Sequence, residues 1–215
     1  MFEEHEYLKA ANEINNIDIE GFEFFTESKQ DHVNCKIYRR YKQDSGLYDY
    51  KILGNLLDVS YERCKTVYMD LEYRKVWDSY VKDLYEFEKS GVKGIYWNVN
   101  YPFPLSNRDY TYISSLYELE VNGVPTTVVL ARSHLVNDIP PKSGVVRVTD
   151  YIQSLTIQGD GNVGTKAYMY YFDNPDGMIP TWLINWAAKT GVPTFMTAMR
   201  QACLGYDDYL KKYKK

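Results

Sequence analysis

The sequence predicts an α+β fold, in which a curved antiparallel sheet of about nine strands surrounds a long C-terminal helix. Between residues 80 and 172 one strand-like segment follows another, with hairpin turns at VNG (121–123) and QGDGNVG (158–164). From Ile179 onward, apolar residues cover most of a helix's circumference, so this helix needs cover on most sides. A sheet of this width curls, and the space between its concave face and the helix need not be filled by side chains.

The N-terminal part predicts one helix and a three-stranded meander. Apolar residues recur at helical spacing within residues 3–15, at Tyr7, Ala10, Ala11 and Ile14. Strands are expected at residues 21–28, 34–41 and 47–54, and KQDSG (42–46) is the turn between the last two.

Two short helices are expected next. The hydroxyl of Ser60 can cap the first of them by accepting a hydrogen bond from a backbone N–H. The inner face of this helix consists of Tyr61, Cys64, Val67 and Tyr68. The second helix lies within LEYRKVWDSY (71–80) and is expected to turn Tyr73, Val76 and Trp77 inward.

Six strands follow, and an aromatic strand–loop–strand unit from Tyr96 to Tyr112 lies among them. Trp97 shares the apolar parity of its strand with Ile95, Val99 and Tyr101. Pro102 and Pro104 then end the strand, because proline has no N–H for the ladder. The alternation resumes at Arg108 and places Tyr110 and Tyr112 on one face. We expect this unit to form the aromatic end of a deep cavity. The other segments are residues 80–88, 111–120, 126–132, 145–157 and 166–172.

The C-terminal helix is expected to begin at Ile179. Pro180 suits its first turn, and Thr181 is a candidate cap. Pro193 lies in the middle of the helix and should kink it, because proline removes one helix hydrogen bond.

Composition indicates one domain over residues 1–215, with a basic tail, DYLKKYKK, at 208–215. The hydrophobic fraction of 45% is enough for a full core, and the net charge of −4 argues against a nucleic-acid partner. The N-terminus MFEEHEYLKA is acidic and does not read as a signal peptide. No apolar run approaches the ~20 residues that a membrane-spanning helix needs.

Neither cysteine nor histidine usage indicates a metal, a cofactor or catalysis. The cysteines are few and lack metal or redox spacing, which favours a reducing cytoplasmic setting: Cys35, Cys64 and Cys203. The histidines lie in separate places: His5, His32 and His134. The sequence also lacks a G-x-S-x-G elbow, so we do not expect an enzyme.

Two groups of residues suit a ligand that carries both charges. Arg74 and Asp78 are one helical turn apart, so the carboxylate can hold the guanidinium for a bidentate phosphate contact. The alternative is a surface ion pair worth only about 0.3–0.5 kcal/mol. Trp97 and Tyr110 lie on strands joined by a short turn, and their faces could enclose a quaternary ammonium. The alternative is ordinary core packing.

Four stretches of the chain carry a family resemblance: EYRKVWDSYVKDLYE, VNYPFPLSNRDYTY, VVRVTDYIQSL and MYYFDNPDGMIPTWLINWAAKTGVP. They resemble the StAR-related lipid-transfer (START) family, and within it the carriers of phosphatidylcholine. The resemblance covers nearly the whole chain and is weakest before residue 35. It implies the helix-grip fold, in which a curved antiparallel sheet and a long C-terminal helix enclose a lipid tunnel.

The resemblance also implies a lipid site. Arg74 would bind the phosphate with Asp78 as its partner, and three aromatic rings would form a cage for the choline. The ligand-binding residues carried over are Tyr68, Arg74, Asp78, Trp97, Tyr110, Tyr151 and Gln153. The sequence departs from the family pattern in the N-terminal helix and in residues 133–143.

The expected function is transfer of one phosphatidylcholine between membranes by a cytoplasmic protein that contacts membrane surfaces transiently. A gate is expected in the C-terminal helix, at Trp182, Trp186 and Pro193, with the lysine tail favouring anionic lipid. The resemblance also implies a protein partner, for example a thioesterase. Three alternatives stay open: a START carrier of ceramide or sterol, a lipid-sensing adaptor that acts through a protein partner, and an enzyme of this fold with Asp78 as its base.

Overall fold

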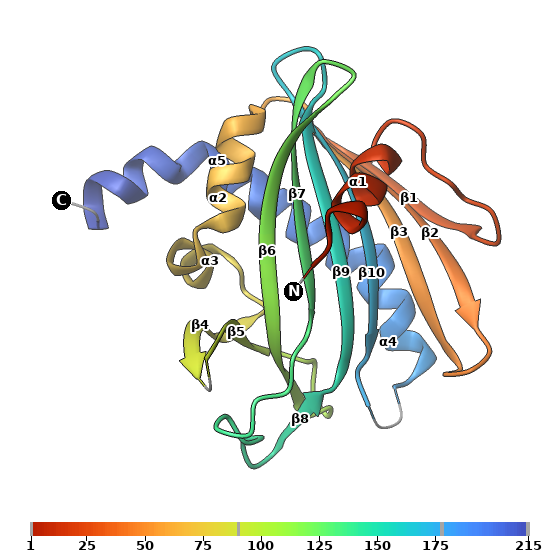
Figure 1. Cartoon of the computed structure of the whole chain (residues 1–215), viewed down its shortest axis with the longest axis vertical. Coiled ribbons are helices and arrows are strands. Elements are labelled where there is room, and N and C mark those ends of the chain that lie inside the picture. The colour runs from red at the N-terminus through yellow and green to blue at the C-terminus, as the bar shows by residue number, and fades with distance from the viewer. Residues whose placement is uncertain (1, 90, 177–178, 214–215) are drawn as a thin grey trace.

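The computed structural model of the chain describes residues 2–89, 91–176 and 179–213 (Figure 1). The helices are α1 (Glu4–Glu13), α2 (Tyr61–Met69), α3 (Leu71–Trp77), α4 (Thr181–Trp186), the π-helical turn η1 (Ala187–Gly191) and α5 (Val192–Tyr213). The strands are β1 (Glu23–Gln30), β2 (Val33–Lys42), β3 (Leu47–Leu56), β4 (Val81–Lys89), β5 (Val92–Val99), β6 (Asn107–Val121), β7 (Val124–Ser133), β8 (Val145–Val148), β9 (Asp150–Gly159) and β10 (Thr165–Asn174). Among these residues, none of the helices combines the length and apolar character needed to cross a membrane.

The strands form one ten-stranded sheet in the order β1-β2-β3-β10-β9-β7-β6-β5-β4, with β8 beside β6. The pairing of β8 with β6 is parallel, whereas the strands along the main path pair antiparallel. The prediction of one strand over residues 145–157 was wrong. The chain must leave β6 and enter the ladder between β7 and β10, so it breaks at Thr149 into β8 and β9.

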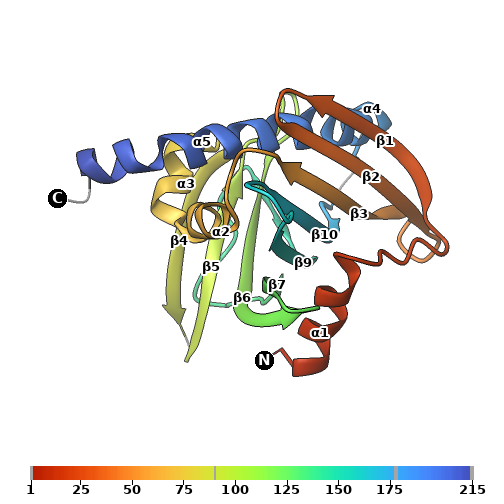
Figure 2. The same ribbon diagram turned by 90° about the horizontal axis from the view of Figure 1, so that it is seen from above.

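The C-terminal helix lies across the concave side of the sheet, as predicted, and Figure 2 shows α5 spanning this open side. Helices α2 and α3 pack beside it. The main core joins these helices to the sheet through Leu56, Val67, Tyr73, Ile157 and Met199. This arrangement confirms the predicted layers: one curved sheet with a helical layer on its concave face.

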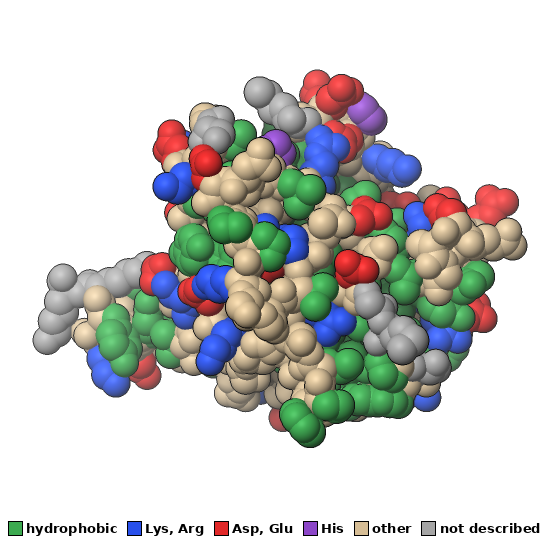
Figure 3. All heavy atoms as spheres, turned by 90° about the horizontal axis from the view of Figure 1, so that it is seen from below, with side chains coloured by type: hydrophobic (Ala, Val, Ile, Leu, Met, Phe, Trp, Pro, Cys, Tyr) green, Lys and Arg blue, Asp and Glu red, His purple; other side chains and the backbone are tan. Residues whose placement is uncertain are grey.

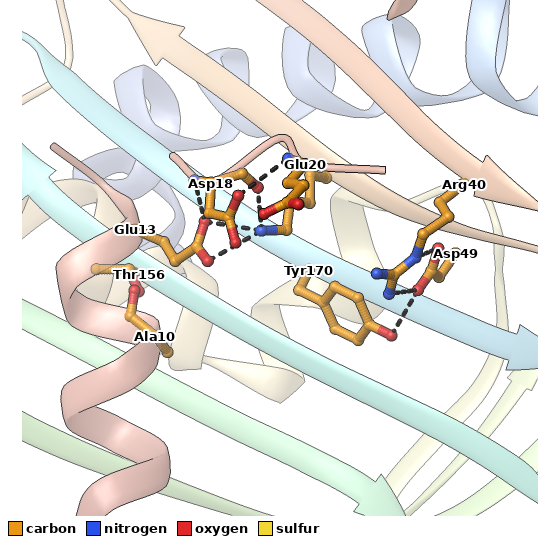
Figure 4. A network of polar contacts seen from close by, with 9 residues as sticks. Ala10, Glu13, Asp18, Glu20, Arg40, Asp49, Thr156 and Tyr170 are labelled. Atoms are coloured by element: carbon orange, nitrogen blue, oxygen red, sulfur yellow. Dashed lines mark hydrogen bonds and ion pairs between the residues drawn. The ribbon is translucent and has the colours of Figure 1, made fainter. Parts of the chain in front are cut away.

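Helix α1 packs on the opposite, convex face of the sheet. Tyr7, Ala10 and Ala11 are buried there against β6 and β7, as the helical spacing predicted. The hydroxyl of Thr156 donates to the carbonyl of Ala10 at 2.9 Å (Figure 4). Lys51 Nζ donates to both carboxylate oxygens of Glu13, at 2.9 and 3.0 Å. Helix α1 therefore fastens the back of the sheet and takes no part in the space between sheet and C-terminal helix.

The two short helices begin where the sequence predicted. Ser60 caps α2 by accepting a hydrogen bond from the N–H of Arg63, and Asp70 caps α3 by accepting from the N–H of Tyr73. Val76, which was predicted to face inward, is 62% exposed. Helix α3 is only seven residues long and packs through Tyr73, so its other side faces solvent.

A π-helical turn interrupts the C-terminal helix just before Pro193. The sequence predicted a disturbance here, because Pro193 has no N–H to donate to the preceding turn. The irregularity lies in η1, where the backbone hydrogen bonds change from the i→i−4 pattern of an α-helix to the i→i−5 pattern of a π-helix. Ala187, Ala188 and Gly191 of this turn lie against the cavity described below, so the irregular part of the helix faces the interior.

Strand β5 is covered on both faces. Trp97 points to the concave side, as predicted, but Tyr96 and Asn98 on the other parity are also buried. Residues 134–144, between β7 and β8, cover that outer face, and Val136 packs on Tyr96. We call residues 134–144 the strap.

Candidate functional site

A cavity of about 420 Å³ lies between the concave face of the sheet and the helical layer. Its walls come from strands β2, β3, β5, β9 and β10, from the segments after β5 and β10, and from helices α2 to α5. The prediction of open space between sheet and C-terminal helix is therefore confirmed.

The cavity changes from polar to apolar along the strands that form its floor. On the paired strands β9 and β10, Gln153 lies opposite Tyr171, while the next inward pairs are Leu155–Met169 and Ile157–Ala167. Helix α5 adds Met196 and Met199 over the apolar part. Methionine side chains are flexible and adapt to irregular apolar surfaces. Such a cavity suits a ligand with a polar head and long apolar chains.

Arg74 and Asp78 form an ion pair in the polar part of the cavity. Arg74 Nε donates to Asp78 Oδ2 at 3.0 Å, and the two side chains are only 14% and 2% exposed. This excludes the alternative of a solvated surface pair. Burial opposes the charge on Arg74, but Tyr68 and Asp78 outweigh that effect and hold the pKa of the guanidinium above its ordinary value.

Asp78 is itself fixed by the end of its helix. Its second oxygen, Oδ1, accepts a hydrogen bond from the N–H of Tyr80 at 3.0 Å. Within the part of the chain that the structure describes, Nε is the one Arg74 atom that donates a hydrogen bond. The terminal NH₂ groups of Arg74 are thus left to bind a planar or tetrahedral oxyanion in the cavity.

The guanidinium of Arg74 also lies over three aromatic rings. Its Cζ is 5.3 Å from the ring centroid of Trp97, 5.4 Å from that of Phe195 and 5.7 Å from that of Tyr68. These contacts keep the guanidinium within the cavity rather than at its rim. Trp97 therefore connects the Arg74–Asp78 ion pair to an aromatic cluster that it forms with Tyr110 and Tyr151.

The three rings predicted to form a cage lie together. Trp97 stacks on Tyr110 with centroids 5.2 Å apart and planes 29° apart, and Tyr110 meets Tyr151 edge-on at 5.4 Å. Trp97 lines the cavity, whereas Tyr110 and Tyr151 are buried behind it. Two rings at stacking distance leave no room between them for a quaternary ammonium. The arrangement is a packed cluster that becomes a cage if Trp97 turns aside.

Trp97 is held in this position by packing and not by a hydrogen bond. Its Nε1 is buried and has no hydrogen-bond partner among the described atoms. An unsatisfied buried donor typically costs about 1–3 kcal/mol, so this position of the indole carries a polar penalty. A rotation that exposes Nε1 to a polar ligand atom or to water would remove that penalty.

Gln153 links the aromatic cluster to the wall beneath Arg74. The hydroxyl of Tyr151 donates to Gln153 Oε1 at 3.2 Å, and Gln153 Nε2 donates to the hydroxyl of Tyr68 at 2.8 Å. Burial raises the pKa of Tyr151 well above its ordinary value, so this hydroxyl remains a neutral donor. The structure thus brings Tyr68 and Gln153 to the polar end of the cavity, beside the other candidate residues.

The residues predicted to form a gate do not share one surface. Trp182 on α4 is 51% exposed. Trp186, one turn later, lines the cavity and meets the ring of Tyr80 edge-on at 6.1 Å. Pro193 is buried at the start of α5, directly after the π-helical turn. Lys214 and Lys215 of the predicted basic tail lie outside the described residues.

Two charged residues of this region were missed from the sequence. Asp173, near the end of β10, lines the cavity and accepts a hydrogen bond from Tyr110 at 2.7 Å. Strand parity could have found it, because Asp173 follows Tyr171 by two positions. Arg108 is buried and donates to the carbonyls of Ser106, Pro175 and Asp176, which joins the segments after β5 and β10.

The candidate for a catalytic base is already engaged. Asp78 binds Arg74 and the Tyr80 N–H, as described, so it is poorly placed to take a proton from a substrate. Nowhere in the described part of the chain do three or more His, Cys, Asp or Glu side chains gather as metal ligands. Cys35, Cys64 and Cys203 are buried free thiols.

The comparisons with known proteins agree with this architecture. The START domain family matches residues 23–206. Phosphatidylcholine transfer protein of Bos taurus is 47% identical over 207 residues, which is 95% of each chain, and that of Homo sapiens is 46% identical over 211 residues, 98% of this chain and 96% of the relative. StAR-related lipid transfer protein 7, mitochondrial, of Homo sapiens is 30% identical over 202 residues, 91% of this chain and 54% of the relative.

Solved structures show the same fold at low sequence identity. Human STARD10 has a TM-score of 0.80 at 23% identity, covering 99% of this chain and 84% of its own. Human StAR-related lipid transfer protein 5 has a TM-score of 0.74 at 14% identity, covering 94% and 97%. Together with the family match, which spans most of the chain, and with the relatives at nearly half identity, this shows that the chain belongs to the START domain family.

Proposed function

We propose that this protein binds one phosphatidylcholine in its cavity and transfers it between membranes. The observation that carries the proposal is the Arg74–Asp78 pair, a buried cation with free donors at the polar end of an otherwise apolar cavity. Relatives of nearly half identity over almost the whole chain are phosphatidylcholine transfer proteins, which supports the same cargo here. The phosphate would bind Arg74, and the choline would lie against the rings of Trp97, Tyr110 and Tyr151.

The free energies involved explain why the headgroup decides the cargo. Each exposed methylene of an acyl chain costs about 0.8 kcal/mol in water, and an apolar cavity removes that cost. A bilayer is equally apolar, so the chains give little preference for protein over membrane. The phosphate and choline contacts must therefore supply the selectivity. The cavity of about 420 Å³ is of ordinary small-molecule size, so two long chains require it to widen, which the methionines and the π-helical turn allow.

Mass spectrometry of the lipid that co-purifies with the recombinant protein tests the proposed cargo. We expect phosphatidylcholine to predominate over the other lipids of the expression host's membranes. Recovery of ceramide or sterol in its place would instead favour the other START carriers. A lipid-sensing adaptor, acting through a protein partner such as a thioesterase, would bind the same lipid. It would then show slow exchange between vesicles, which a transfer assay with fluorescent phosphatidylcholine detects.

Trp97→Ala should weaken the choice of headgroup more than it weakens lipid uptake. The substitution removes the one ring of the cluster that faces the cavity, and a ring face contributes about 0.5–2 kcal/mol to binding a cation. Competition between phosphatidylcholine and phosphatidylethanolamine for the protein measures this choice. Trp77→Ala is the matched control, since Trp77 packs beside α5 outside the cavity lining. An unchanged headgroup preference in Trp97→Ala would exclude the cage.

We also propose that the α4 end of the molecule contacts the membrane surface, as a cytoplasmic protein that binds bilayers transiently would require. Trp182 on α4 and Phe103, which follows the cavity-lining Tyr101 and Pro102, are both exposed, and hydrophobic side chains gather on the α4 side in Figure 3. Aromatic side chains partition well into the interface of a bilayer.

Trp182→Ser should slow transfer between vesicles without reducing the lipid held at equilibrium, because the exposed ring contacts the bilayer and not the bound lipid. Stopped-flow transfer of fluorescent phosphatidylcholine measures the rate. Val76→Ser, an exposed apolar position on α3, is the control and should transfer normally. Equal rates for wild type and Trp182→Ser would rule out membrane contact through this residue.

A further inference from the structure

We propose that the carboxylate of Asp173 is the counter-charge for the cationic headgroup and selects charged headgroups over uncharged ones of the same shape. This inference rests on the proposed function and extends it to a residue outside the predicted site. It is carried by the position of Asp173 in the cavity wall, by its hydrogen bond from Tyr110 of the aromatic cluster, and by the fact that no described residue forms an ion pair with it.

Asp173 belongs to the row of β10 side chains that line the cavity. Every second side chain of β10 lines the cavity on the concave face, at positions 165, 167, 169, 171 and 173. Asp173 pairs with Tyr151 on the neighbouring strand β9. The hydroxyl of Tyr110 donates to Asp173 Oδ2 at 2.7 Å from behind the wall. Trp97 stacks on that same Tyr110 ring. The carboxylate is therefore fixed at the edge of the aromatic cluster, and the guanidinium of Arg74 lies 5.3 Å from the ring centroid of Trp97 in the same cluster.

Among the described residues that line the cavity, three side chains are charged, and one of them has no described ion-pair partner. Arg74 and Asp78 neutralise each other. Within the described ranges, Asp173 takes part in no ion pair. Arg108, whose charge lowers the pKa of Asp173, donates its hydrogen bonds to the carbonyls of Ser106, Pro175 and Asp176. A buried anion without a partner is costly, and a quaternary ammonium in the cavity would supply the missing charge.

The surroundings of Asp173 explain how the wall tolerates this carboxylate. The groups that face it are the hydroxyls of Tyr110 on β6 and Tyr171 on β10, together with Tyr101, Tyr151, Arg108 and Asp150. Burial raises the pKa of Asp173, and the hydrogen bonds from Tyr110 and Tyr171 and the charge of Arg108 partly oppose that rise. The raised pKa means that Asp173 binds its proton more tightly in the folded protein than in the unfolded chain. Ionisation of Asp173 at neutral pH therefore lowers the free energy of unfolding. A residue that lowers stability in a ligand cavity is more readily explained by binding than by folding.

The test compares phosphatidylcholine with an isosteric lipid that lacks the positive charge, the tert-butylethyl ester of phosphatidic acid, in which carbon replaces the quaternary nitrogen. Both lipids carry the same acyl chains and are offered at equal amounts in vesicles. The protein is re-isolated, and its bound lipids are quantified by mass spectrometry at neutral pH and in steps down to about pH 5. Wild type should take up mostly phosphatidylcholine, and this preference should fall as the pH is lowered and Asp173 becomes protonated.

Asp173→Asn keeps the shape of the side chain and an oxygen that accepts from Tyr110. It should reduce the preference for phosphatidylcholine roughly tenfold and remove its pH dependence, while thermal stability stays equal or rises. Asp150→Asn, which removes a nearby exposed carboxylate, should behave as wild type. Tyr110→Phe keeps the ring but removes one of the hydrogen bonds that hold the carboxylate, and it should reduce the preference in part.

Three results separate the inference from the function beneath it. Wild-type protein that takes up neither lipid would contradict the proposed transfer function. Wild-type protein that takes up both lipids equally would leave that function standing and overturn the role of Asp173. An Asp173→Asn variant that retains both the preference and its pH dependence would overturn the role as well.

Discussion

Arg74→Ala is expected to reduce phosphatidylcholine transfer by at least about 100-fold, because it removes the charged donors available to the phosphate. The terminal NH₂ groups of Arg74 face a cavity in which water cannot replace them cheaply. Transfer of fluorescent phosphatidylcholine between vesicles measures the loss. Normal transfer by a folded Arg74→Ala protein would refute the phosphate assignment.

The same substitution also has a cost in stability that must be separated from the loss of function. Asp78 is almost fully buried, and removal of its partner leaves a buried charge that typically costs about 3–5 kcal/mol. The double variant Arg74→Ala/Asp78→Asn removes that charge and should recover much of the stability without recovering transfer. Arg200→Ala is the matched control. It breaks the ion pair with Asp58, outside the cavity lining, and should lose stability while transfer persists.

The spacing of Arg74 and Asp78 was visible in the sequence, but their burial was not. A spacing of four residues on a helix places two side chains side by side, whether or not other residues cover them. Burial depends on Trp97 from β5 and Phe195 from α5, which lie far away in sequence. Local periodicity could therefore predict the pair, and only the tertiary structure could decide between a surface pair and a clamp.

For the aromatic residues too, the sequence predicted which side chains meet, and only the tertiary structure shows how they pack. Strand parity predicted that Trp97 faces the cavity, and the hairpin predicted that it meets Tyr110. The stacking of the two rings at 5.2 Å follows from side-chain rotamers that neighbouring strands and helices select together. Strand parity could place Asp173 on the cavity side, but its hydrogen bond from Tyr110 on β6 is a tertiary contact that the sequence does not show. The parallel strand β8 was missed because four residues carry too little pattern to show where a strand breaks.

Arg147→Ala is expected to lower the free energy of unfolding by about 3–5 kcal/mol, because it leaves a fully buried carboxylate without its cationic partner. Arg147 on β8 donates to both oxygens of Asp109 on β6, at 2.7 and 3.1 Å, and Asp109 is completely buried. The hydroxyl of Tyr96 donates to the same carboxylate at 3.0 Å, and Arg147 also donates to the carbonyl of Ile139 in the strap. Urea unfolding followed by fluorescence measures the change.

A double-mutant cycle separates the pair from its surroundings. Asp109→Asn/Arg147→Met removes both charges and should cost clearly less than the sum of the two single substitutions. Lys142, also in the strap, forms an exposed ion pair with Asp83 on β4, and Lys142→Ala should cost no more than about 1 kcal/mol. If Arg147→Ala cost as little as Lys142→Ala, the buried pair would not be what holds the strap and β8 to the sheet.

The buried Arg147–Asp109 pair is also connected to the proposed lipid site, through strands β5 and β6. Asp109 stands between Arg108 and Tyr110 on β6, and it points to the outer face while Tyr110 points to the aromatic cluster. Tyr96, its second partner, is the neighbour of Trp97 on β5. Loosening the outer face therefore frees the two strands that carry the stacked rings. We expect Arg147→Ala protein, at a temperature where it remains folded, to lose part of the preference for choline over ethanolamine headgroups, although Arg147 is not among the residues that line the cavity.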